Sequence, residues 1–161
     1  LPILGINTAI ISIIAQNIGA KQHNRVEQSY FTSVRYGLCL MIIAGIIIYL
    51  TAEIVPKFFS SNIDVIAYGT MYLKISAFIL PAYPIFFLSN GFFMALKKSE
   101  KAMLNNIIRN VIVPILSFYI ARHINADFKT FFYIWAAFQW TISLLLFAYV
   151  NYYIKNKLNQ I

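Results

Sequence analysis

The side chains with potential for binding chemistry are uncharged polar groups set inside long apolar stretches. Tyr83 and Asn90 follow Pro81 in one stretch, and Gln139 lies in another. Proline in a helix interior bends the chain and frees backbone carbonyls, which opens space beside it. Phenol and amide groups there can form hydrogen bonds to a small organic molecule in a mostly apolar cavity. Tyr83, Asn90 and Gln139 are therefore our cavity candidates, with hydrogen bonding between packed helices as the alternative role.

The sequence lacks the constellations that catalysis or metal binding requires. Cys39 lies between Leu38 and Leu40, and the chain contains no second thiol. His23 and His123 fall in polar breaks that are far apart in the sequence. An enzyme needs His, Asp or Cys side chains at catalytic spacing, and we find none. We expect no enzyme activity, no metal site and no bound cofactor.

The composition is that of a membrane protein. Hydrophobic residues make up 60% of the 161 residues and charged residues 11%, with a mean hydropathy of +0.70. Soluble domains average roughly 25% charged residues, whereas about 20 consecutive apolar residues cross a bilayer core. The net charge of +8 arises from Lys and Arg in the breaks between apolar runs. This distribution indicates contact with lipid surfaces and argues against nucleic-acid binding.

Five apolar runs predict an all-α polytopic bundle of about five transmembrane helices. Their approximate bounds are 1–20, 30–53, 68–96, 103–121 and 130–154, within one unit spanning 1–161. The fourth helix is the least clear, because its charge-free part covers only Asn110 to Ala121. Expected caps at the starts of the second, third and fourth helices are Asn24 with Glu27, Ser61 with Asp64, and Ser99. Gly37 and Gly45 are expected to let neighbouring helices approach closely.

The basic residues set the expected orientation. Lys21, Lys97 and the C-terminal lysines lie in alternate breaks, which hold more Lys and Arg than the breaks between them. The positive-inside rule therefore predicts a cytoplasmic C-terminus. Arg109 borders the short fourth run, and we expect its long side chain to snorkel to the interface. The alternative is that Arg109 pairs with a loop carboxylate and acts as a gate on the cytoplasmic side.

A junction near the N-terminus resembles one found in the multidrug and toxic compound extrusion (MATE) family. In the stretch AQNIGAKQHNRVEQS, Gln16, Gly19 and Ala20 close one helix and Arg25 opens the next. Further similar motifs follow in family order: Phe58, Phe59 and Asp64 before Tyr72 and Leu73; Pro81 before Asn90, Gly91 and Ala95; and RNVIVPI from Arg109. The resemblance covers essentially the whole chain.

The resemblance implies a particular architecture and activity. Family members have twelve helices in two six-helix lobes forming an inverted V, so this chain would hold helices eight to twelve of the C-terminal lobe. The N-terminal lobe would then be missing, and the start at Leu1 without methionine also leads us to expect upstream residues. The implied function is efflux of xenobiotic, often cationic compounds by alternating access, driven by H⁺ or Na⁺. The expected location is the cytoplasmic membrane of a prokaryote.

Ion coupling needs an ionisable group at membrane depth. All five carboxylates lie near expected helix ends: Glu27, Glu53, Asp64, Glu100 and Asp127. We therefore expect the coupling carboxylate to lie in the missing part. The closest rival function is a lipid-linked oligosaccharide or polysaccharide flippase of the same superfamily. Such a protein should line its cavity with several Arg or Lys, whereas the apolar runs here contain no cation at their centres. A passive scaffold role also remains open.

Overall fold

The computed structural model describes residues 2–158, and the regular elements in that range are helices without a strand. In chain order they are α1 (Pro2–Gly19), α2 (His23–Thr51), α3 (Val55–Phe59), α4 (Ile63–Ile79), α5 (Ala82–Ala95), α6 (Ser99–Ile107), the π-helical turn η1 (Ile108–Ile112), α7 (Val113–His123) and α8 (Phe128–Lys157). The all-α fold class expected from the sequence is confirmed.

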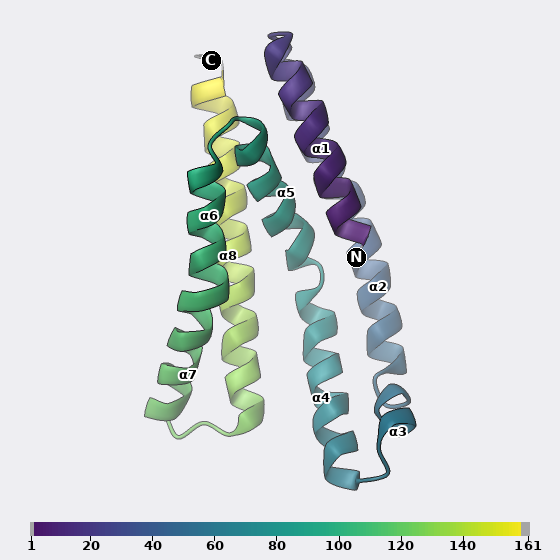
Figure 1. Ribbon diagram of the computed structural model, residues 1–161. Helices are drawn as coiled ribbons and strands as arrows, with labels where there is room; N and C mark the ends of the chain where they lie inside the picture. Colours follow the sequence, from purple (N-terminus) through teal and green to yellow (C-terminus); the bar gives the residue numbers. More distant parts are fainter. Residues whose placement is uncertain (1, 159–161) are drawn as a thin grey trace.

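The helices are long and apolar enough for a polytopic membrane protein. Within the described residues, α1, α2, the continuous helix Ser99–His123 and α8 each qualify as a span. The pair α4 and α5 qualifies together as a fifth, although it is bent by 48° at its break. These legs run alternately up and down in Figure 1, with short connections at both ends. Outward-facing isoleucines of α2 are largely exposed, as a lipid-facing surface requires.

Several helix bounds differ from those read off the apolar runs. The second helix starts at His23, close to the start that a cap at Asn24 implied, so polar helical turns precede the apolar run given as 30–53. The helix expected over 68–96 is divided at Leu80 and Pro81 into α4 and α5. The fourth helix extends from Ser99 to His123, which agrees with the start expected at Ser99 and is longer than the apolar run given as 103–121. Hydropathy marks the part of a helix that meets lipid, whereas hydrogen bonding decides where the helix begins and ends.

Three helices, α1, α5 and α7, are each followed two residues later by a residue with left-handed backbone geometry. Lys21, Lys97 and Asn125 have φ angles of 56°, 57° and 50°. After α1, the Lys21 N–H donates to a carbonyl three residues back, and the Gln22 N–H donates to the Asn17 carbonyl at 2.8 Å. This pair of bonds is a Schellman motif, which usually carries glycine at the left-handed position. Lys21 and Lys97 therefore occupy positions where the backbone of a residue other than glycine is strained.

The helix starts do not follow the expected caps. Asn62 rather than Ser61 caps α4, since its side-chain oxygen accepts from the backbone N–H of Asp64 at 2.9 Å. No side-chain cap precedes α2 or α6, so neither the capping box expected at Asn24 nor the cap expected at Ser99 is formed. Asp127 caps α8 by accepting from the Thr130 N–H at 3.0 Å.

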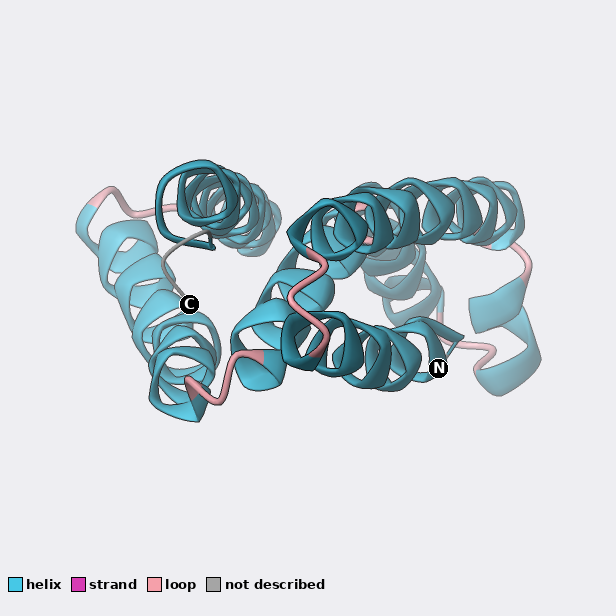
Figure 2. Ribbon diagram, turned by 90° about the horizontal axis from the view of Figure 1, so that it is seen from above, coloured by secondary structure: helices cyan, strands magenta, loops and turns pink. Residues whose placement is uncertain are grey.

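Helix α5 is the central element of the bundle. Eleven of its fourteen residues are buried, and it packs against α1, α2 and α8. Seen from above in Figure 2, the hairpin of α7 and α8 lies to one side of α5, while α1 and α2 lie to the other. Gly37 of α2 permits close packing against α5, since a Cβ there would lie 2.8 Å from the Pro84 Cβ. Gly45 does the same against α4, since a Cβ there would lie 2.8 Å from the Ala77 carbonyl oxygen.

Candidate functional site

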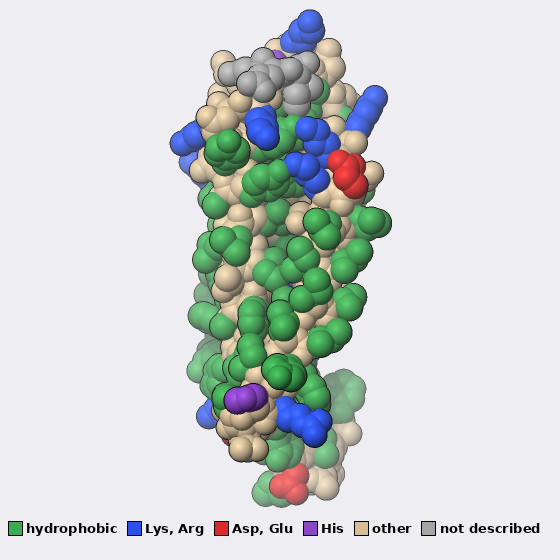
Figure 3. All heavy atoms as spheres, turned by 90° about the vertical axis from the view of Figure 1, so that its left-hand side faces the viewer, with side chains coloured by type: hydrophobic (Ala, Val, Ile, Leu, Met, Phe, Trp, Pro, Cys, Tyr) green, Lys and Arg blue, Asp and Glu red, His purple; other side chains and the backbone are tan. Residues whose placement is uncertain are grey.

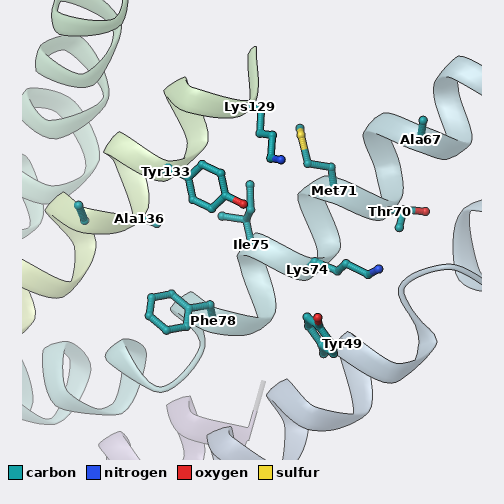
Figure 4. A pocket seen from close by; sticks show the side chains of 11 residues that line it. Tyr49, Ala67, Thr70, Met71, Lys74, Ile75, Phe78, Lys129, Tyr133 and Ala136 are labelled. Carbon is teal, nitrogen blue, oxygen red and sulfur yellow. The ribbon is translucent and has the colours of Figure 1, made fainter. Parts of the chain in front are cut away.

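An open groove of about 620 Å³ lies between α2, α4 and α8. Its walls are largely aromatic and aliphatic, and they include Tyr49 from α2, Ile75 and Phe78 from α4, and Tyr133 from α8. Figure 4 shows these side chains arranged around a shared space. A second hollow of about 340 Å³ adjoins the groove along α2 and extends to Trp140. The volume and lining suit a drug-sized, mostly apolar ligand.

Two lysines border this groove. Lys74 forms an ion pair with Glu53 at 2.6 Å, and the pKa of the Glu53 carboxyl is lowered by the hydrogen bond and positive charge of Lys74. Lys129 lies 5.9 Å from the centre of the Tyr133 ring. The residues lining the groove include no carboxylate. A cationic ligand would find aromatic faces there but no opposite charge.

A second feature is a line of buried polar side chains between α5, the Ser99–His123 helix and α8, which we call the polar seam. Its members are each at most 4% exposed: Ser89, Asn90, Arg109, Ser117, Gln139 and Ser143. Buried polar groups are normally hydrogen-bonded, because an unpaired group loses its contact with water without compensation. Two members of the seam, Asn90 and Arg109, bond to a neighbouring helix and so help to set the register of the helices.

Arg109 is the charged member of the polar seam. It lies within the π-helical turn η1, near the middle of the Ser99–His123 helix, and is 4% exposed. Its Nε–H donates to Gln139 Oε1 at 2.6 Å. Its guanidinium carbon is 4.2 Å from the ring centre of Phe86 and 4.5 Å from that of Tyr83. Planar guanidinium groups stack favourably on aromatic faces in this way.

The expectation that Arg109 snorkels to the interface is therefore wrong. Its side chain points into the bundle, where Gln139 and the α5 aromatic rings hold it. The prediction that no cation lies at the centre of an apolar run is also wrong, because Arg109 lies near the middle of the Ser99–His123 span. A gating role for Arg109 stays a prediction, and its position is the middle of a span rather than the cytoplasmic end.

The three cavity candidates lie in or beside the polar seam, and none of them is among the residues that line the open groove. Gln139 bonds to Arg109, and Tyr83 stacks on the same guanidinium. Asn90 accepts a hydrogen bond from Asn105 at 3.0 Å. The bonds of Gln139 and Asn90 join different helices, which is the alternative role stated for them. Their part in a ligand cavity stays a prediction.

A buried hydrogen bond links α2 to the polar seam. The Ser89 Oγ–H donates to the Ile85 carbonyl at 2.6 Å, which leaves its oxygen free to accept. Tyr30 therefore donates its hydroxyl proton to Ser89 Oγ, at 2.7 Å. Tyr30 is fully buried and its ring packs edge-on against Phe92. This contact ties α2 firmly to α5.

The family-like junction lies at the end of the bundle where α8 ends (Figure 1). Gln16, Gly19, Ala20 and Arg25 are all exposed there, outside both the groove and the polar seam. Lys98 in the α5–α6 connection and Lys101 in the first turn of α6 share this end, and they bond to Tyr153 and Tyr149 of α8. Figure 3 shows Lys and Arg side chains gathered at this end above a broad hydrophobic band.

Sequence reasoning missed the groove. Its wall residues lie on three helices, and an apolar run does not reveal which residues of different helices will face one another. Lys74 offered one signal, since it interrupts the apolar pattern shortly before the charge-free stretch that begins at Ile75. Within residues 2–158 no cluster of three or more His, Cys, Asp or Glu side chains is suited to a metal ion.

Comparison with known proteins places these features in context. The model of the family described as MatE matches residues 1–120. A relative from Bacillus subtilis (strain 168), the "Probable multidrug resistance protein YpnP", is 29% identical over 123 residues. That alignment covers 76% of this chain and 26% of the relative, so the chain spans about a quarter of the relative's length. No solved structure matches the chain significantly.

Proposed function

The chain belongs to the MatE family, and from this premise we propose that it forms the C-terminal lobe of a secondary active transporter. The complete transporter would export bulky organic compounds, including cations, across the cytoplasmic membrane by alternating access. Inward movement of H⁺ or Na⁺ would drive export. The name of the Bacillus subtilis relative, which refers to multidrug resistance, supports the substrate class.

The observation that carries this proposal is the open groove beside the bent pair α4 and α5. Its volume of about 620 Å³ and its aromatic walls match the needs of a site that accepts varied amphipathic compounds. Alternating access requires helices that change their mutual arrangement, and a bend of 48° provides a place for such movement. Few specific polar contacts line the groove, which favours broad selectivity over tight recognition.

Carboxylates that could bind the coupling ion or attract a cationic substrate would have to come from outside this chain. Each of the five carboxylates is exposed near a helix end, so none offers an ion site at membrane depth. The groove carries lysines and no carboxylate. The carboxylates that bind H⁺ or Na⁺ and attract organic cations would therefore lie in the remaining part of the transporter.

Orientation follows from the distribution of charge. The α1–α2 connection with Lys21, the α5–α6 connection with Lys97 and the last turns of α8 with its lysines share one end of the bundle (Figure 1). The positive-inside rule favours the cytoplasm for that end and the outer surface for α3 and the α7–α8 connection. Exposed Phe58 and Phe59 of α3 suit an interfacial position on the outer side. The groove, which borders Lys74 and Lys129, would then open toward the outside.

Transport by the complete protein in everted membrane vesicles tests the proposal. We expect uptake of ethidium into the vesicles when a proton or sodium gradient is imposed, and its loss when an ionophore collapses that gradient. Phe78→Ala in the groove should slow uptake, whereas Phe118→Ala on an exposed surface of α7 should not. Gradient-independent ethidium movement, or equal effects of the two variants, would contradict the proposal.

A flippase for lipid-linked oligosaccharides is the second candidate, and Arg109 is the observation that favours it. A cation buried near the middle of a span suits an anionic substrate such as a pyrophosphate. Among residues 2–158, however, Arg109 is the single buried Lys or Arg. A pyrophosphate group needs several such cations, so drug efflux remains the better-supported proposal.

A further inference from the structure

Among residues 2–158, no acidic side chain pairs with Arg109. The five Asp and Glu residues are all exposed near helix ends, and the ion pair found among the described residues joins Lys74 to Glu53. Arg109 itself is 4% exposed. A charge buried near the middle of a span is costly unless an opposite charge or dense hydrogen bonding compensates it.

The hydrogen bonding of Arg109 is also incomplete. A guanidinium has five N–H donors, and one of them, on Nε, donates to Gln139. Between residues 2 and 158, the terminal nitrogens of Arg109 find no hydrogen-bond acceptor. The rings of Tyr83 and Phe86 attract the cation through their faces but offer no acceptor for these N–H groups.

The arrangement leaves the donors grouped together. Gln139 accepts from the Nε–H, and the rings of Tyr83, Phe86 and Phe87 lie within 5.4 Å of the guanidinium carbon. The two terminal nitrogens, which form the outer fork, have no hydrogen-bond acceptor among the described residues. The side-chain nitrogen of Gln139 adds a neighbouring donor, because it shares a carbon with the oxygen that binds Arg109. Paired N–H donors in this fork geometry match a carboxylate bidentately.

Two further atoms of the polar seam point to missing partners. Asn90 Nδ2 and Ser117 Oγ are buried and have no hydrogen-bond partner in the described part of the chain. The π-helical turn that holds Arg109 departs from regular α-helix geometry, and such turns are frequent at functional sites. Arg109, Asn90 and Ser117 of the polar seam thus each carry a polar atom without a hydrogen-bond partner in the described part of the chain.

We propose that Arg109 and Gln139 form a buried carboxylate-binding site in the polar seam, filled from outside this chain. The carboxylate belongs either to another segment of the complete transporter or to a transported compound. The second source rests on the proposed transport function, whereas the first requires only that the chain be part of a larger protein. A carboxylate that pairs with Arg109 in one arrangement of the helices would favour that arrangement over others.

Binding of benzoate to the purified complete transporter tests for a mobile carboxylate. Titration calorimetry should show saturable binding to the wild type, with benzamide as the uncharged control probe. Arg109→Gln should weaken benzoate binding at least tenfold, and Arg109→Lys should weaken it too because a lysine lacks the fork. Arg122→Gln is the matched control, since Arg122 is an exposed arginine on the same continuous helix. It should leave benzoate binding unchanged.

Gln139→Glu provides a variant that does not depend on losing the buried charge. Its new carboxylate would lie beside Arg109 and fill the site from within. This variant should fold, melt at or above the wild-type temperature and lose benzoate binding. If Arg109→Gln fails to fold, Gln139→Glu and Arg109→Lys still decide whether the site accepts a carboxylate.

If the transporter's own carboxylate fills the site, benzoate will not bind the wild type. Arg109→Gln should then lower the melting temperature in the wild type but not in a variant whose partner carboxylate is neutralised. Two results together would overturn the proposal. Benzoate binding would be absent or unchanged by substitution of Arg109, and Arg109→Gln would lower the melting temperature equally in every variant with a neutralised carboxylate. Uptake of an uncharged dye by the same preparations reports separately on transport, so failure of this site is distinguishable from failure of the proposed function.

Discussion

Replacement of Gly45 by alanine tests the close packing of α2 on α4. The added Cβ would lie 2.8 Å from the Ala77 carbonyl oxygen, while ordinary contact begins near 3.4 Å. The obstacle is backbone rather than a flexible side chain, so the helices must separate by roughly 0.6 Å to restore ordinary contact. Overpacking of this kind typically costs about 1–3 kcal/mol.

Alanine also favours helix formation over glycine by about 1 kcal/mol, which opposes the packing cost. Gly5→Ala is the matched control, because Gly5 lies in α1 and an added Cβ there would have no atom within 4 Å. Both substitutions share the helix preference, so their difference isolates the packing cost. We expect Gly45→Ala to be less stable than Gly5→Ala by about 1–3 kcal/mol.

Reversible unfolding of the complete transporter by sodium dodecyl sulfate in mixed micelles measures this difference. The free energy of unfolding should rise slightly for Gly5→Ala and fall, or stay nearly level, for Gly45→Ala. Equal stability of the two variants would refute the reasoning, because it would mean that α2 and α4 do not meet at Gly45 as described.

Three other predictions concern hydrogen bonds that join or begin helices. Asn62→Ala should lower the free energy of unfolding by about 1 kcal/mol, because α4 loses its side-chain cap. Ser89→Ala should destabilise more than Tyr30→Phe, since it leaves the buried Tyr30 hydroxyl without a partner, whereas Tyr30→Phe leaves Ser89 bonded to a backbone carbonyl. The pKa of Asp127 is lowered by its hydrogen bonds from Thr130, so its cap should stabilise α8 at neutral pH and weaken as the pH falls below about 4.

Each of these has a control and a contrary outcome. For the α4 cap, Ser61→Ala should have little effect, and a larger loss than for Asn62→Ala would identify Ser61 as the cap instead. For the buried pair, equal losses in chemical unfolding would show that the direction of the hydrogen bond is misassigned. For Asp127→Asn, the acid-induced loss of stability between neutral pH and pH 3 should diminish, and an unchanged pH profile would contradict the linkage.

Long apolar runs predicted the helices because lipid leaves the backbone no partner except itself. The bend between α4 and α5 was likewise expected, since Pro81 lacks the N–H that a continuous helix would use. The caps predicted at Asn24 and Ser99 do not form. The left-handed residues Lys21 and Lys97 follow the ends of the preceding helices and set where the next helices start. A cap pattern read from residue types does not contain that backbone geometry.

The polar seam was predicted only in part, because the contacts between its residues depend on how the helices pack. Tyr83 and Gln139 were singled out from the sequence, but their meeting at Arg109 depends on packing between residues that are far apart along the chain. Snorkelling was expected because Arg109 borders its apolar run in the sequence. The helix begins at Ser99, as expected, and Arg109 therefore lies near its middle rather than at its end.

The position of Arg109 also affects how the protein enters the membrane. An arginine near the centre of a helix raises the cost of leaving the translocon by about 2.5–3.5 kcal/mol. The segment Ser99–His123 is therefore a weak insertion signal by itself, and the partner that accepts from Arg109 lies on α8, which is synthesised later. We expect this segment to enter the bilayer together with α8 as a hairpin. Glycosylation mapping of the segment with and without α8 would measure that dependence during synthesis.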